Sequence, residues 1–133
     1  MRENMGLYRG KRTDNGEWAI GCLTHDIDGT LNQIEVFKRY CLCDIWEVDP
    51  STVGQDTGLT DKSGKRIFEG DVVSGLFLYA LPINSVCVFR DGAFGLEWER
   101  GGAKQFTAFT SMCNVEFEVI GNVHDNPELK GDC

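Results

Sequence analysis

Turn-forming residues recur along this chain at short intervals, and they limit the length that any one element can reach. The sequences Asp14-Asn15-Gly16, Asp28-Gly29, Asp61-Lys62-Ser63-Gly64 and Asp91-Gly92 all favour tight turns. Between them lie short runs rich in Val, Ile, Phe, Tyr and Trp, residue types that favour β-strands. About seven or more short strands, separated by turns, predict an all-β domain with only minor helical turns.

The first hairpin is predicted around Asn15-Gly16, because this pair supplies the positive φ angles of a type I′ turn. Residues 7–11 and 17–23 would then pair as antiparallel strands. Side chains alternate along a strand, so three residues of the second strand should share one face. These three are Trp18, Ile20 and Cys22.

Two further strands are expected before the middle of the chain. Residues 33–40 favour a strand, and a short helix is the alternative, because short apolar runs are ambiguous. Residues 41–48 form another apolar run. That strand should end at Asp49-Pro50, because proline cannot donate a hydrogen bond to a neighbouring strand.

Residues 53–73 hold four of the sixteen glycines. Gly54 and Gly58 bracket an expected polar loop, and residues 61–64 an expected turn with aspartate at its first position and glycine at its fourth. Gly70-Asp71 at the start of the next strand predicts a bulge or tight corner. Most of the special residues here thus have a structural explanation.

The second half of the chain should contain more short strands. They are expected at residues 85–90, 93–98, 105–109 and 115–124. The expected connections include a loop through Gly75 and Pro82 and a flexible link over 100–104. By analogy this spacing is that of a small SH3-like barrel. We therefore expect one domain over residues 1–133, with a hairpin-rich N-terminal lobe of about 1–52 and a barrel lobe of about 53–129.

Composition indicates a globular protein of the cytoplasm. The chain has 13 basic and 21 acidic residues and a net charge of −8, which opposes binding to a phosphate backbone. The N-terminus lacks the apolar run of a signal peptide, and no segment has the roughly 20 apolar residues of a membrane span. The six cysteines are therefore expected to be reduced thiols.

Several segments together resemble the YopX family. They are residues 8–18 (YRGKRTDNGEW), 48–55 (VDPSTVGQ), 57–65 (TGLTDKSGK), 67–73 (IFEGDVV) and 120–129 (IGNVHDNPEL). The resemblance covers nearly the whole chain in order; it departs at Asp56, where the family usually has tyrosine. It implies a small, β-rich, self-associating protein of phages and prophages. It carries over no catalytic residues.

Candidate chemistry is sparse. Cys41 and Cys43 could hold a metal with His25 or His124, but the spacing lacks the second pair of a structural zinc site, so free thiols are favoured. Carboxylates could instead support a metal-dependent hydrolase. These are Asp56, Asp61, Glu69 and Asp71. Turn geometry explains several of them, so catalysis is the weaker hypothesis and no cofactor is expected.

Nucleic-acid binding has two local supports, each a group of cations close to an aromatic residue. The first group is Arg9, Lys11 and Arg12 with Trp18, and the second is Lys62, Lys65 and Arg66 with Phe68. A solvated strand face shows the same pattern, and the net charge opposes such binding.

The favoured hypothesis is a non-enzymatic module that contacts other proteins. It would associate mainly with itself, with another phage or host protein as a further partner and no membrane attachment; accessory nucleic-acid binding in phage replication is the alternative. Five polar residues would form the candidate interaction surface on a rigid, exposed loop. They are Gln55, Asp56, Thr57, Lys62 and Arg66.

Overall fold

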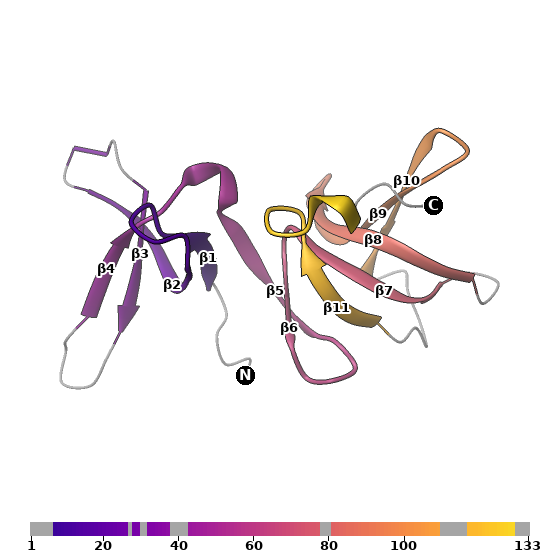
Figure 1. Cartoon of the computed structure of the whole chain (residues 1–133), viewed down its shortest axis with the longest axis horizontal. Helices are drawn as coiled ribbons and strands as arrows, with labels where there is room; N and C mark the ends of the chain where they lie inside the picture. The colour runs from indigo at the N-terminus through magenta and orange to yellow at the C-terminus, as the bar shows by residue number, and fades with distance from the viewer. Residues whose placement is uncertain are drawn as a thin grey trace. The chain divides into compact units, whose positions relative to one another are not determined.

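The computed structural model describes residues 7–26, 28–29, 32–37, 43–77, 81–109 and 117–129. These residues form antiparallel strands with short 3-10 helices, so the expected all-β class is confirmed (Figure 1). The chain divides into two compact units, Met1–Asp56 and Thr57–Cys133. The boundary lies inside the fifth strand, between Asp56 and Thr57.

The first unit is built on four antiparallel strands in the order β4-β3-β2-β1. They are β1 (Tyr8–Lys11), β2 (Trp18–His25), β3 (Asn32–Phe37) and β4 (Cys43–Glu47). The strand expected over 33–40 is therefore confirmed for its described part, in preference to a helix. The free edge of β1 pairs with the start of β5 (Gly54–Thr60), at Tyr8↔Gln55 and Arg9↔Gly54.

The first hairpin forms where expected, but its turn is not type I′. Gly16 alone in this turn has a positive φ, of 74°, and its N–H donates to the Arg12 carbonyl at 3.0 Å. The Asn15 side chain instead accepts the Glu17 N–H at 2.9 Å. The loop is therefore longer than two residues, because Asn15 acts through its side chain rather than through a left-handed backbone.

The short helix η2 (Pro50–Thr52) connects β4 to β5. Asp49 caps it, with Oδ1 accepting the Ser51 N–H at 3.0 Å. Thr52 Oγ1 accepts the Lys11 N–H at 2.8 Å and donates to the Asp49 carbonyl at 2.6 Å. The strand ends at Asp49-Pro50 as predicted, and these side chains hold the connection against β1.

The core of the first unit lies on one face of its sheet. Ala19, Ile34 and Val48 are buried there, with exposed fractions of 5%, 0% and 1%. Alternation along β2 places Trp18, Ile20 and Cys22 on the opposite face, as expected. We call that opposite side of β1–β4 the outer sheet face.

The second unit contains the later part of β5 and six more strands. They are β6 (Arg66–Phe68), β7 (Asp71–Phe77), β8 (Leu81–Arg90), β9 (Ala93–Arg100), β10 (Ala103–Ala108) and β11 (Phe117–Asn122), followed by η4 (Pro127–Leu129). Five of them form an antiparallel sheet in the order β10-β9-β8-β7-β11. Asp91-Gly92 is a two-residue turn with both φ angles positive, as predicted.

Three expected connections prove to be regular structure. The polar loop between Gly54 and Gly58 is part of β5. The loop through Gly75 and Pro82 is largely replaced by paired ends of β7 and β8, although residues 78–80 lie outside the described residues. The link over 100–104 is a tight hairpin, because Gly101 and Gly102 take positive φ angles and let Arg100 pair with Ala103.

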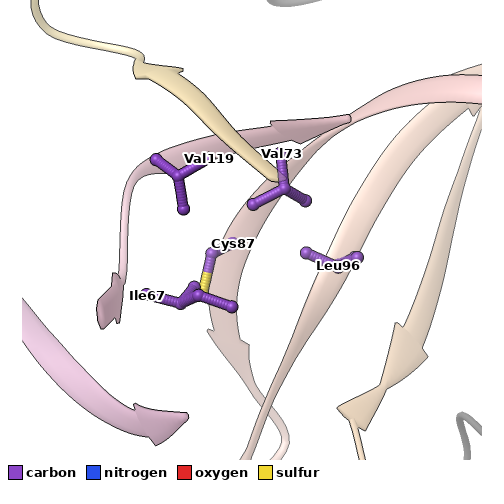
Figure 2. Close-up of a cluster of buried hydrophobic side chains, with 5 residues drawn as sticks. All are labelled: Ile67, Val73, Cys87, Leu96 and Val119. Carbon is purple, nitrogen blue, oxygen red and sulfur yellow. The ribbon is translucent and has the colours of Figure 1, made fainter. Parts of the chain in front are cut away.

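The expected barrel is not closed within the described residues. The two edges of the five-stranded sheet are β10 and β11, so the sheet remains open. Its core lies around Ile67 on β6, Cys87 on β8 and Leu96 on β9, each at most 1% exposed; Figure 2 shows these side chains with Val73 and Val119. The Cys87 thiol is buried and packs as a small apolar side chain.

Candidate interaction surface

The five predicted surface residues are not all exposed. Lys62 is exposed, and Gln55 and Arg66 are half-buried. Asp56 and Thr57 are only 7% and 9% exposed, so the expectation that they would be exposed was wrong. The reason is that they lie in strand β5 instead of a loop. Gln55 and Asp56 belong to the first unit, and the other three belong to the second.

Hydrogen bonds tie both buried β5 residues to other segments of their units. In the second unit, Thr57 Oγ1 donates to the Ile67 carbonyl at 2.8 Å and accepts the Leu59 N–H at 3.2 Å. In the first unit, the Asp56 N–H donates to the Leu7 carbonyl at 2.9 Å. Thr57 therefore stabilises the fold, and a partner could reach only the exposed and half-buried members of the set.

Asp61 is a buried carboxylate that organises the turn after β5. Its Oδ1 accepts the N–H groups of Ser63 and Lys65, each at 2.9 Å, and its Oδ2 accepts the N–H of Val119 at 3.0 Å. Burial acts to raise the pKa of Asp61, but the three backbone N–H groups and the nearby Lys65 charge together lower it. A carboxylate held in this way stays ionised and serves the structure.

The other candidate carboxylates do not form a metal site in the described residues. Asp71 is 2% exposed, and its Oδ2 accepts the Phe68 N–H at 2.8 Å across the corner formed by Gly70, whose φ is 94°. No group of three histidine, cysteine or acidic residues within the described ranges could hold a metal ion. Cys41 lies outside the described residues, so the possible pairing of Cys41 with Cys43 cannot be placed.

The segment after β11 is held by a network around Asn122. The side-chain Oδ1 of Asn122 accepts the N–H groups of His124 and Asp125, at 3.0 and 2.8 Å. Its Nδ2 donates to Asp125 Oδ2 at 3.1 Å, and the Asn126 N–H donates to its carbonyl at 2.8 Å. Residues 121–126, which help to carry the family resemblance, thus form a turn closed by their own polar groups.

The first basic and aromatic group is largely engaged within the first unit. The Arg9 guanidinium lies 4.6 Å from the Trp18 ring centroid and the Lys11 amine lies 5.5 Å from it. The Arg12 guanidinium carbon lies 3.6 Å from the Trp46 ring centroid, and the sequence did not indicate this partner. Arg12 also forms an ion pair with Asp14, with 2.7 Å between Arg12 Nη2 and Asp14 Oδ2. The hydrogen bond from Arg12 is the main cause of the lowered pKa of Asp14.

A hollow of about 450 Å³ lies beside this group. It is formed by residues 11–13, Gly16 and 47–50, where the Thr13 N–H donates to the Glu47 carbonyl at 3.0 Å. Arg12 contributes to its wall, but Asp14 and Trp46 already occupy the guanidinium. The Arg12 guanidinium is therefore poorly available to a phosphate bound in this hollow.

In the second basic group, the aromatic member is unavailable for stacking. Phe68 is only 4% exposed, so a nucleic-acid base cannot stack on its ring. Lys62 and Lys65 remain exposed on the turn after β5. This group therefore combines exposed cations with a buried aromatic side chain.

Two isoleucines on the outer sheet face are exposed, and the sequence did not predict their exposure. Ile20 on β2 is 43% exposed and Ile45 on β4 is 50% exposed. Both belong to this face, because Ile45 lies opposite Glu35, and Glu35 lies opposite Cys22. The apolar run of Trp18, Ala19 and Ile20 shows which side chains share a face, but it does not show which of the two faces packs on the core.

No helix among the described residues is both long and apolar enough to cross a membrane.

Comparisons with known proteins give one consistent result. The family model described as YopX protein matches residues 7–129. Among solved structures, the chain is similar to the X-ray crystal structure of protein yopX from Bacillus subtilis, with a TM-score of 0.60. The two are 19% identical, over 97% of this chain and 98% of that chain, a likeness that shows a shared fold. No curated protein sequence matches this chain.

Proposed function

This chain belongs to the YopX family, and on that premise we propose that it is a phage or prophage protein that acts through protein contacts, without catalysis. It works in the cytoplasm of the host as a homo-oligomer. The observation that carries this proposal is the outer sheet face, where Ile20 and Ile45 leave apolar surface in contact with solvent. Apolar surface of this kind is stabilised when another protein covers it.

The state of the carboxylates supports a non-catalytic role. Asp61 and Asp71 are at most 8% exposed, and both accept backbone N–H groups. A general acid or base must reach a substrate, and a carboxylate with a lowered pKa is a weak base. Two of the four residues that favoured hydrolysis in the sequence, Asp61 and Asp71, therefore hold a turn and a corner in this fold.

We expect the wild-type protein to sediment as a homo-oligomer at micromolar concentration and to dissociate on dilution. Sedimentation velocity over a hundredfold concentration range measures this directly. Varying the salt concentration in the same experiment separates apolar contacts from ionic ones, since salt screens the latter. A strict monomer at the highest concentration would contradict the oligomeric part of the proposal.

Nucleic-acid binding is the alternative, and the structure provides a specific way to test it. Because Phe68 is buried and Arg12 is held by Asp14 and Trp46, we expect no saturable retention of single-stranded DNA, double-stranded DNA or RNA in filter binding at low salt. Tight binding that weakens as Lys11 is replaced by alanine would instead support the alternative and place the contact at the first hairpin.

A further inference from the structure

The outer sheet face places Lys11 and Glu35, which have opposite charges, on either side of Ile20. Lys11 on β1 lies opposite Trp18, two residues before Ile20. Glu35 on β3 lies opposite Cys22, two residues after Ile20. A cation and a carboxylate are thus placed diagonally on either side of an exposed isoleucine, at equal offsets along and across the strands.

From this pattern we propose that the outer sheet face is the contact between two copies of this chain, related by a two-fold axis that passes at Ile20. The inference rests on the proposed homo-oligomer and specifies its surface. A two-fold contact must be self-complementary, because each residue meets the same patch of the other copy. Here Ile20 packs on Ile20 of the second copy, and each Lys11 faces Glu35 of the other.

Charge and apolar surface both match in this arrangement. The end of the face near β1 carries the half-buried Lys11, whose amine lies 5.5 Å from the Trp18 ring centroid, whereas Arg9 is only 8% exposed. The opposite end carries the Glu35 carboxylate, with the exposed Ile45 beside it on β4. The two-fold rotation that brings the carboxylate to the lysine also moves Ile45 toward the Trp18 end of the other copy. The apolar contacts are then flanked on each side by one ion pair between lysine and glutamate. Specific interfaces commonly have such an apolar centre and a charged rim.

Two charge reversals test this register. In Lys11→Glu, each contact would place glutamate against Glu35, and in Glu35→Lys it would place lysine against Lys11. We expect each variant alone to dissociate at least about tenfold more readily than the wild type. An equimolar mixture should recover oligomers, because in the mixed pair both contacts join a glutamate to a lysine. Sedimentation of one fluorescently labelled variant with the other measures this recovery.

The recovery distinguishes a direct contact from damage to the fold, since mixing cannot repair a misfolded chain. Ile20→Thr provides a second test, with Ile120→Thr as the matched control on β11 of the other unit, where Ile120 is 38% exposed. We expect about tenfold weaker association for Ile20→Thr and no change for Ile120→Thr. Circular dichroism of each variant checks that it is folded.

The failures of the two proposals can be told apart. A wild-type protein that remains monomeric overturns the homo-oligomer itself. A wild-type oligomer that is insensitive to Ile20→Thr, or whose charge-reversed variants do not associate on mixing, overturns this surface and leaves the homo-oligomer standing.

Discussion

Replacement of Asp61 by alanine is expected to lower the free energy of unfolding by about 3 kcal/mol. The carboxylate accepts three backbone N–H groups, from Ser63, Lys65 and Val119. Alanine would leave these donors without their acceptor at a site where Asp61 itself is only 8% exposed. The Val119 bond also joins the turn after β5 to the middle of β11, so its loss weakens two distant segments at once. Urea denaturation followed by tryptophan fluorescence measures the change.

Two variants calibrate this result. In Asp61→Asn the amide oxygen can still accept the two N–H groups at Oδ1, but an NH₂ group then faces the Val119 N–H, so we expect a smaller loss than for alanine. Asp28→Ala changes an exposed aspartate in another turn, and we expect a change within about 0.5 kcal/mol. Equal effects at Asp28 and Asp61 would contradict the structural role of Asp61.

The stability contributed by Asp61 should depend on pH. Its pKa in the folded state lies below the unfolded value of about 3.9. The ionised group therefore stabilises the fold fully above that value, and the stabilisation is lost as pH falls through the folded pKa. The stability difference between the wild type and Asp61→Asn should be constant near neutral pH and shrink in acid. A difference that grows in acid would mean that the folded pKa is raised instead.

Local signals predicted the hairpins well because a short turn depends on few residues. Asp91-Gly92 forms the expected two-residue turn, since both residues take positive φ angles of 53° and 82°. Asn15-Gly16 carries an equally strong signal, yet its loop is longer, because the Arg12 carbonyl and the Asn15 side chain provide other partners for the backbone. The two dipeptides therefore support two turn geometries, and hydrogen bonds within the longer loop accompany the difference.

Burial in the candidate surface could not be predicted from the sequence in the same way. The local pattern predicts that Thr57 is a loop residue between two glycines, but its hydroxyl donates to the Ile67 carbonyl, ten residues further along the chain. Asp61 was correctly assigned to a turn, whereas its bond to Val119 joins residues 58 positions apart. Pairing between distant strands decides which polar side chains are buried, and a local pattern contains no information about it.

The largest loss in stability from truncating an apolar side chain is expected in the core of the second unit. Leu96 on β9 is 1% exposed and belongs to the cluster with Ile67, Val73, Cys87 and Val119 (Figure 2). Leu96→Ala should lower the free energy of unfolding by about 2–5 kcal/mol, because it removes buried apolar contacts and leaves a cavity. Denaturant midpoints at constant slope would measure this loss.

A second leucine in the same unit provides the matched control for this prediction. Leu59 on β5 is 42% exposed, so Leu59→Ala changes the same atoms with far less loss of buried area and should cost less than about 1 kcal/mol. The difference between the two variants then reports burial rather than the chemistry of leucine. If the two substitutions have equal costs, the cluster around Leu96 is not the stabilising core of this unit, and the open sheet must be covered by contacts other than those between its own strands.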